Sequence, residues 1–246
     1  MHPRIVIPAR LDAGRLPGKV LLPIGDKPLL QHVWERGCAA GLGSPPLVAT
    51  DDERVAAAAR GFGAEVVMSA AGHCCGSERV AEVAAGLDAE LIINLQADEA
   101  LIDPAAVAGL TELFGDPAVE MATLAAPLTA PEQLADPALV KVVVDERGDA
   151  LYFSRAAIPH PRRGAPPQAP WLGHLGVYAY RRRLLLDIYA RPRSALERVE
   201  GLEQLRVLEA GRRIRTRICR SAHFGIDTQA DLERARTALG QGEAGG

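Results

Sequence analysis

Short apolar runs alternate with amphipathic stretches of helical length along this chain, and that alternation limits the folds that it can adopt. Arg4–Pro8, Leu47–Thr50 and Glu90–Gln96 have the length of strands. The last run is predominantly apolar, which is typical of a strand buried at the centre of a parallel sheet. The stretches between such runs suit crossover helices. The sequence therefore predicts an α/β fold, a mostly parallel twisted sheet with helices on both faces.

The predicted elements follow from this periodicity and from its breaks. The expected strands are Arg4–Pro8, Leu47–Thr50, Glu65–Ser69, Glu90–Gln96, Met121–Pro127, Leu139–Val144, Ala150–Phe153, His174–Tyr180 and Arg215–Cys219. The expected helices are Pro28–Ala40, Asp52–Phe62, Ser77–Leu87, Pro104–Phe114, Arg181–Ala190, Glu200–Glu209 and Thr228–Leu239, and Ile158–Pro170 reads as a loop. At 246 residues we expect one domain, with a nucleotide-binding half at about residues 1–115, an irregular half at about 116–239 and a flexible tail at 240–246.

Composition narrows the possible partners. The net charge of −3 argues against a broad nucleic-acid surface, which needs a surplus of Lys and Arg. No apolar run approaches the roughly 18 residues of a membrane helix, and the N-terminus has no signal-peptide pattern. The four cysteines lack CxxC spacing, so we expect reduced thiols in a cytoplasmic protein.

The segment Pro8–Lys19 follows the first predicted strand, at the sheet edge where open α/β folds bind ligands. It contains two glycines and three cations, Arg10, Arg15 and Lys19. Flexible amide donors and positive side chains suit a triphosphate. Neither GxGxxG nor GxxxxGK[ST] is present, which weakens dinucleotide and P-loop interpretations. The alternative is a solvated basic loop.

Two carboxylates are candidates for a metal site. Asp98 directly follows the buried strand ending near Gln96, and a carboxylate there is costly unless it meets a cation. Mg²⁺ favours one or two carboxylates together with substrate phosphates. Asp227 precedes the last helix and could supply the second carboxylate. The alternatives are a turn or capping role for Asp98 and a plain N-cap role for Asp227 or Thr228.

Ten ordered segments make a more specific pattern than any one motif. They are Ile7–Arg10, Arg15–Lys19, Lys27–Leu29, Val48–Asp52, Gly76–Arg79, Asn94–Glu99, Phe153–Arg155, His174–Arg181, Leu202–Arg206 and Ile226–Thr228. In this order they resemble the 3-deoxy-manno-octulosonate cytidylyltransferase (CMP-Kdo synthetase) family. The resemblance extends from about residue 4 to residue 239.

The resemblance implies a reaction and its components. CTP and a sugar acid would bind with Mg²⁺, the 2-hydroxyl of the acid would attack the α-phosphorus, and pyrophosphate would leave. The product would serve lipopolysaccharide biosynthesis, and the enzyme would be a homodimer. The residues implied for the nucleotide are Ala9, Arg10, Arg15, Lys19, Gly76, Ser77 and Arg79, with Lys19, Arg10 and Asp98 catalytic and with Asp98 and Asp227 holding the metal.

The resemblance also implies an acceptor pocket. Its residues would be Gln96, Arg155, His174, Tyr178, Glu203 and Gln204. The planar fork of Arg155 suits a carboxylate. Without the resemblance, His174 would be interpreted as a structural histidine, Tyr178 as a core residue, and Glu203 with Gln204 as the solvated face of a helix.

The chain departs from the family pattern at three places. Ala97 and Ala100 stand where the family has Gly and Pro, and Cys74-Cys75 replaces Gln-Ser. We interpret the two cysteines as small buried residues rather than a redox pair. The loop at 159–172 is short and altered, which favours a changed acceptor such as an amino-sugar analogue or a phosphonate as an alternative.

Two further alternatives stay open. A sugar-phosphate nucleotidyltransferase would need a phosphate site, which Arg162-Arg163 could provide. A non-catalytic nucleotide-binding homologue would explain the changes at Cys74, Cys75 and Ala97. The presence of Lys19, Asp98 and Asp227 together weighs against that second alternative.

Overall fold

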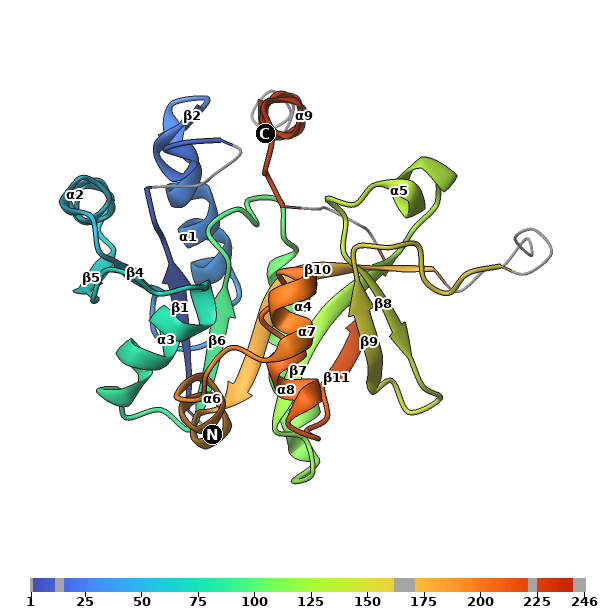
Figure 1. The fold of residues 1–246 in the computed structure, drawn as a ribbon. Helices are drawn as coiled ribbons and strands as arrows, with labels where there is room; N and C mark the ends of the chain where they lie inside the picture. Colours follow the sequence, from blue (N-terminus) through green and yellow to red (C-terminus); the bar gives the residue numbers. More distant parts are fainter. Residues whose placement is uncertain (1, 12–15, 162–170, 221–224, 241–246) are drawn as a thin grey trace.

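A mixed β-sheet with helices on both faces forms the body of the protein (Figure 1). The computed structural model describes residues 2–11, 16–161, 171–220 and 225–240. The sheet order is β11-β7-β10-β6-β1-β4-β5, with the β8–β9 hairpin joined to it through β10. The strands are β1 (Pro3–Pro8), β4 (Leu47–Thr50), β5 (Glu65–Met68), β6 (Leu91–Leu95), β7 (Met121–Pro127), β8 (Lys141–Val144), β9 (Ala150–Ser154), β10 (Leu172–Arg181) and β11 (Arg215–Ile218).

The four strands β6, β1, β4 and β5 are parallel, and they contain the point at which the chain reverses its direction across the sheet. From β1 the chain moves to β4 and β5 on one side, and then returns past β1 to β6 on the other side. Ligands of open α/β sheets bind at the carboxyl ends of strands next to such a switch point. The segments that follow β1 and β6 therefore begin at the expected binding edge.

Strand β10 divides the sheet into two halves. It runs antiparallel to both β6 and β7, whereas β11 lies parallel to β7. The predicted fold class is confirmed, but the antiparallel direction of β10 was not predicted. It places the beginning of β10 beside the carboxyl end of β6, where Gln96 N donates to Gly176 O at 3.2 Å.

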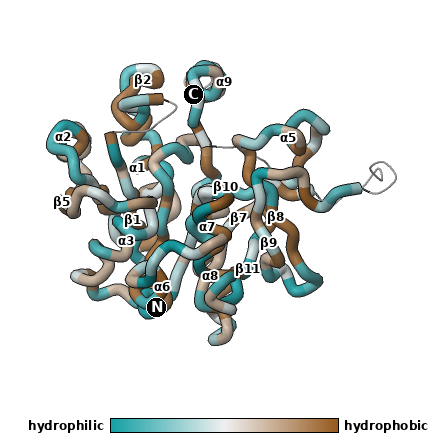
Figure 2. The backbone as a smooth tube through the Cα atoms, in the orientation of Figure 1, coloured by the Kyte–Doolittle hydropathy of each residue, from teal (hydrophilic) through white to brown (hydrophobic). Residues whose placement is uncertain are grey.

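The helices cover the two faces of the sheet in separate apolar clusters. They are α1 (Leu29–Ala39), α2 (Glu53–Gly61), α3 (Gly76–Ala85), α4 (Pro104–Glu112), α5 (Pro131–Ala135), α6 (Arg182–Tyr189), α7 (Ala195–Glu200), α8 (Leu205–Glu209) and α9 (Gln229–Gly240). Alternation along β1 separates the clusters, because Ile5 and Ile7 join α1, α2, α4 and α9, whereas Val6 joins α3, α6 and α8. Figure 2 shows the mixed hydropathy of these helices, and α2 buries Val55 and Ala59 against the core.

The C-terminal helix crosses back to the first half of the chain. Helix α9 lies beside β2 (Pro23–Ile24) (Figure 1), and both Arg236 Nε and Nη2 donate to Pro23 O. The residues just before α9 are thereby held close to the segment after β1. This return explains how residues 19 and 227 come to share one site.

Most element predictions are confirmed to within two or three residues, but the predicted helix Glu200–Glu209 is wrong. Ser194 and Glu197 form a capping box that begins α7, and Gly201 ends it with φ of 65°, a left-handed conformation that favours glycine. Helix α8 begins only at Leu205. Helix α5 and the β2–β3 hairpin, whose second strand is Lys27–Pro28, were not predicted. Most of the predicted loop Ile158–Pro170 lies outside the described residues.

Within the described ranges, no helix combines the length and the apolar character needed to cross a membrane.

Gly37 sets the distance between α1 and the loop that leads to β4. A Cβ atom at residue 37 would lie 2.5 Å from Pro46 Cγ and 3.4 Å from Leu95 Cδ2. We expect Gly37→Ala to lower the free energy of unfolding in urea by about 1–3 kcal/mol through overpacking. Gly61→Ala in α2 is the control, because nothing lies within 4 Å of its Cβ position, and it should be neutral or stabilising. Equal losses in both variants would contradict this account.

Candidate active site

Lys19 enters the site from the loop that follows β1. It begins the short 3₁₀ helix η1 (Lys19–Leu21), directly after Gly18, whose φ of 70° is left-handed. Gly18 N donates to Leu11 O at 2.8 Å, which closes the loop on itself. The loop thus directs the Lys19 side chain towards the carboxyl end of β6.

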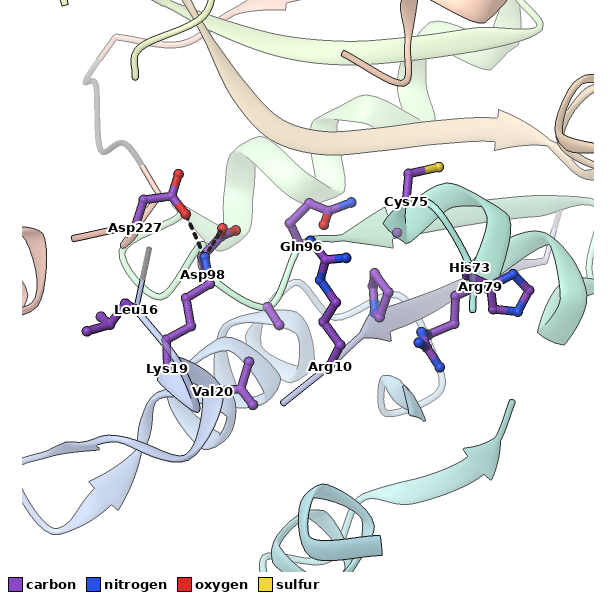
Figure 3. Close-up of a pocket in the computed structure, with 13 residues that line it drawn as sticks. Arg10, Leu16, Lys19, Val20, His73, Cys75, Arg79, Gln96, Asp98 and Asp227 are labelled. Carbon is purple, nitrogen blue, oxygen red and sulfur yellow. Dashed lines mark hydrogen bonds and ion pairs between the residues drawn. The ribbon is translucent and has the colours of Figure 1, made fainter. Parts of the chain in front are cut away.

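The ammonium group of Lys19 lies between two carboxylates (Figure 3). Its Nζ atom is 2.7 Å from Asp98 Oδ2 and 2.7 Å from Asp227 Oδ1, and it donates to Ile226 O at 3.1 Å. Asp98 follows β6, and Asp227 comes just before α9. Three segments far apart in the sequence therefore meet at one cation, as the sequence predicted for a single site.

This cluster is only partly open to solvent. The exposed fractions of the Lys19, Asp98 and Asp227 side chains are 12%, 24% and 34%. Burial alone would lower the pKa of Lys19, but the negative charges of Asp98 and Asp227 outweigh it and raise that pKa. Lys19 therefore stays a cation over the physiological range.

Asp231 caps the start of the last helix. Asp231 Oδ2 accepts from the backbone N–H groups of Asp227 and Thr228 at 3.1 and 2.8 Å. The Thr228 hydroxyl in turn accepts from Asp231 N at 3.2 Å. Thr228 and Asp231 thus form the reciprocal cap, so the plain N-cap interpretation applies to Thr228, while the Asp227 side chain turns to Lys19.

Two adjoining cavities open at this edge of the sheet. The first has a volume of 320 Å³, and Lys19, His73 and Arg79 are among its lining residues. The second has a volume of 1030 Å³ and extends between β10, α5 and α9. Both are lined by Arg10, Cys75, Gly76, Gln96, Asp98 and Asp227. This shared wall allows two ligands to meet beside the two carboxylates.

The predicted nucleotide residues separate into three groups. Arg10, Lys19, Gly76 and Arg79 line the first cavity. Ala9 and Ser77 are fully buried and line neither cavity, so they do not offer their side chains to a ligand there. Arg15 lies outside the described residues, as do Arg162 and Arg163.

Gly76 must be a glycine for the first cavity to have its present wall. A Cβ atom at residue 76 would lie 2.8 Å from Gln96 Nε2 and 3.2 Å from Pro8 Cγ. The first residue of α3 can therefore approach the ends of β1 and β6 closely. Arg79, one turn further along α3, pairs with Asp51 at 2.9 Å, which fixes its guanidinium near the cavity.

All six predicted acceptor residues line the second cavity. They are Gln96, Arg155, His174, Tyr178, Glu203 and Gln204. The Tyr178 hydroxyl donates to Gln204 Oε1 at 3.1 Å, and the exposed fractions of these two residues are 4% and 1%. Gln204 Nε2 has no hydrogen-bond partner although it is buried. A buried donor without a partner is costly, so the hydrogen-bonding capacity of Gln204 Nε2 is left unused in this wall.

Arg155 is fixed at the far side of the same cavity. Its Nε donates to Glu200 O and its Nη1 donates to Pro137 O, both at 3.0 Å. These two bonds hold the guanidinium plane and leave Nη2 for another acceptor. Nη2 can therefore give a carboxylate oxygen a charge-assisted hydrogen bond.

His174 is a neutral residue of the cavity wall. Thr123 Oγ1 donates to Val177 O, so it accepts from His174 Nε2, at 2.9 Å. Burial lowers the pKa of His174 to about 3. The neutral ring therefore has Nδ1 as an acceptor. His174 contacts Thr123 through Nε2 and also lines the second cavity.

Glu203, which the resemblance implied as an acceptor residue, lines the second cavity and is not on the solvated face of a helix. It lies in the turn before α8, and burial raises the pKa of its carboxyl group. Its Oε2 accepts from Ser77 N at 3.0 Å and its Oε1 accepts from Ser77 Oγ at 2.9 Å. Glu203 therefore links the first turn of α3 to the wall of the second cavity.

The structure differs from the sequence predictions at Glu99, which was not predicted as part of the site, and in the burial of the cysteines. Glu99 is 4% exposed and accepts from Gly176 N at 2.6 Å. Burial and the charge of Asp98 raise the pKa of Glu99. Its position next to Asp98 was the available signal. Cys74 is exposed and Cys75 is half-buried, so the interpretation of both as small buried residues is wrong, and none of the four cysteines is in a disulfide.

The fold and the paired carboxylates at its switch point define a nucleotidyltransferase of the α/β class. The sequence matches the model of the cytidylyltransferase family over residues 4–214. A 3-deoxy-manno-octulosonate cytidylyltransferase of Solibacter usitatus is 49% identical, over 93% of this chain and 91% of its own length. The Escherichia coli enzyme of that name is 45% identical, over 96% of both chains. The chain belongs to the family of 3-deoxy-manno-octulosonate cytidylyltransferases.

Solved structures agree with this assignment. A CMP:2-keto-3-deoxy-manno-octonic acid synthetase complexed with CTP has a TM-score of 0.91 at 44% identity, and covers 98% of this chain and 100% of its own. A putative glucose-1-phosphate thymidylyltransferase from Bacillus anthracis has a TM-score of 0.68 at 15% identity, covering 96% of this chain and 94% of its own, which shows a shared fold.

The low pKa of His174 predicts how stability depends on pH. The unfolded chain binds a proton at residue 174 near pH 6.5, whereas the folded chain does not until about pH 3. The contribution of His174 is therefore present above pH 6.5 and is lost as the pH falls. Between pH 7.5 and pH 5, wild type should lose about 1 kcal/mol more unfolding free energy than His174→Gln, allowing for partial exposure. Parallel losses in urea titrations of the two proteins would refute this.

Proposed function

We propose that this chain transfers the cytidylyl group of CTP to 3-deoxy-manno-octulosonate or a closely related sugar acid and releases pyrophosphate. The observation that carries the proposal is the meeting of Lys19, Asp98 and Asp227 at the wall shared by two cavities. Positive and negative side chains arranged in this way suit a reaction whose catalysis consists of positioning and charge neutralisation.

The two carboxylates fit Mg²⁺. The Lys19 ammonium lies 2.7 Å from an oxygen of each, so one position near both carboxylates already suits a cation. Hard carboxylate oxygens completed by phosphate oxygens are the ligands that Mg²⁺ takes in nucleotide sites. Asp98 and Asp227 would hold the ion, which supplies charge neutralisation on the phosphates when bound.

The remaining residues of the first cavity bind and orient the nucleotide. Arg10 and Lys19 come from the loop after β1 and offer positive charge to the triphosphate. We assign to Lys19 the stabilisation of the charge that develops on the leaving pyrophosphate. Gly76 lets the backbone of α3 approach the nucleotide, and Arg79 borders it from the same helix. The first half of the chain, about residues 1–115, thus supplies most of the nucleotide side.

The second cavity would hold the acceptor. Arg155 Nη2 and Gln204 Nε2 would donate to a carboxylate or a hydroxyl oxygen, and His174 Nδ1 would accept from a hydroxyl group. Gln96 lines both cavities, and so borders the place where the acceptor hydroxyl meets the α-phosphorus. A cytoplasmic homodimer, with contacts from the second half of the chain, belongs to the same proposal.

Asp98→Asn tests the proposed role of the carboxylates while keeping the shape of the side chain. We expect kcat/KM for CTP to fall at least about 100-fold, since charge-stabilising groups of this kind contribute that much. Asp88→Asn is the control, because Asp88 is an exposed loop residue after α3. Pyrophosphate release measures the rate, and far-ultraviolet circular dichroism should show an unchanged fold. Full activity of Asp98→Asn would remove Asp98 from the mechanism.

A panel of acceptors tests the substrate class. With CTP and Mg²⁺, pyrophosphate release should be fastest with 3-deoxy-manno-octulosonate, and at least about tenfold slower with sugar 1-phosphates, because the donors in the second cavity suit a carboxylate. An amino-sugar analogue or a phosphonate as best acceptor would instead favour the changed-acceptor alternative. CTP binding without turnover with any acceptor would favour a non-catalytic homologue.

A further inference from the structure

Arg206 is a buried cation that lines neither cavity, and it links two parts of the site. Its exposed fraction is 2%, and it belongs to α8, directly after the Glu203–Gln204 turn. Its Nε and Nη2 donate to the two oxygens of Glu197, each at 2.7 Å. Its guanidinium carbon also lies 4.9 Å from the centre of the Tyr189 ring. The ion pair with Glu197 and the contact with the Tyr189 ring therefore fix the orientation of the Arg206 guanidinium.

The same guanidinium reaches across to α3. Arg206 Nη2 donates to Glu78 Oε1 at 2.7 Å, over a separation of 128 residues. Glu78 lies in the first turn of α3, and its Oε2 accepts from Cys74 N at 2.8 Å. A continuous chain of charge-assisted hydrogen bonds thus runs from Glu197 through Arg206 and Glu78 to the backbone just before Gly76.

A second link runs beside the first. Ser77 N and Oγ donate to Glu203, and Ser77 Oγ also lies 3.1 Å from the Tyr180 hydroxyl. The segment 203–206 therefore holds the segment 74–78 at two places, through Glu203 and through Arg206. Cys75 and Gly76, between those two places, line both cavities.

Stability alone is a weak reason for such a cluster. Burying a cation with two carboxylates costs desolvation free energy, and well-packed apolar side chains often replace buried ion pairs without loss of stability. What an ion pair of fixed geometry does supply is a defined distance and orientation between the elements that it joins. Here those elements are the turn before α8 and the wall of the first cavity.

We propose that Arg206 is a positioning residue for the nucleotide: through Glu78 it sets the place of the Cys74–Gly76 backbone, and so the affinity of the first cavity for CTP. This inference rests on the proposed function. Arg206 contacts no ligand itself. The acceptor residue Gln204 sits in the same short segment, so the two cavities have a common support.

Glu78→Ala is the sharpest test, because it removes the link to Cys74 N while leaving the Arg206–Glu197 pair in place. KM for CTP should rise about tenfold, the loss of roughly one charge-assisted hydrogen bond. The value of kcat at saturating CTP should stay within about twofold of wild type. Arg206→Met should raise KM for CTP at least as much.

Arg206→Lys separates positioning from charge. Lys keeps the charge but cannot contact Glu197 and Glu78 through a planar fork, so its KM for CTP should lie between those of wild type and Arg206→Met. Arg212→Ala is the matched control, because it breaks the exposed ion pair with Glu120, 3.0 Å long, without contacting α3. Its KM for CTP should equal that of wild type.

Binding of CTP to the unmodified protein separates the two proposals. The thermal midpoint measured against CTP concentration, with Mg²⁺ present, gives the affinity of each variant without turnover. If wild type shows no shift with CTP, the proposed function and this inference both fall. If wild type and Glu78→Ala bind CTP equally, the inference alone is overturned. The same holds if the variants keep the KM of wild type and their kcat falls only by the fraction of protein that is misfolded.

Discussion

One ammonium group held between two carboxylates organises the active site. Lys19, Asp98 and Asp227 come from the loop after β1, the end of β6 and the entrance to α9, and they meet only because α9 returns to pack beside β2. The attraction between the ammonium and the two carboxylates offsets part of the desolvation cost that these charges have at a half-buried edge of the sheet. This contact joins the segments that follow β1 and β6 to the segment that precedes α9. The wall that the two cavities share lies around it.

The residues that line the two cavities were easier to predict from the sequence than the buried contacts that hold them in place. Lys19 and Asp98 follow strands whose carboxyl ends must lie at one edge of a parallel sheet, so their approach follows from local sequence and general topology. The six residues that the resemblance implied for the acceptor lie together along one cavity. Ser77 and Ala9 are buried and line neither cavity, because whether a side chain at the end of a strand or in the first turn of a helix faces a cavity or the core depends on what packs against it. Ser77 donates to Glu203, 126 residues away, and no local sequence pattern predicts that contact.

The fold shows the same division between local and distant determinants. The strand Met121–Pro127 was predicted with its observed bounds, because its length and apolar character are local properties. The direction of β10 is not local, since a strand of given pattern can pair in either direction. The break at Gly201 was missed because polar and apolar residues on both sides keep a helical period, and only the left-handed glycine interrupts it. The capping box at Ser194 was readable in the sequence and would have located the start of α7.

The direction of β10 has a consequence for how the acceptor site can change over evolution. His174, Gly176 and Tyr178 alternate along one face of a strand that is hydrogen-bonded on both sides, so that face borders the second cavity, the proposed acceptor site, while the opposite face lies in the hydrophobic core. A surface loop can exchange residues freely, but each exchange here must also preserve the pairing of β6 and β7 with β10. The shape of this proposed acceptor wall is therefore tied to the integrity of the sheet, and the wall should diverge more slowly among descendants than the loops around the first cavity.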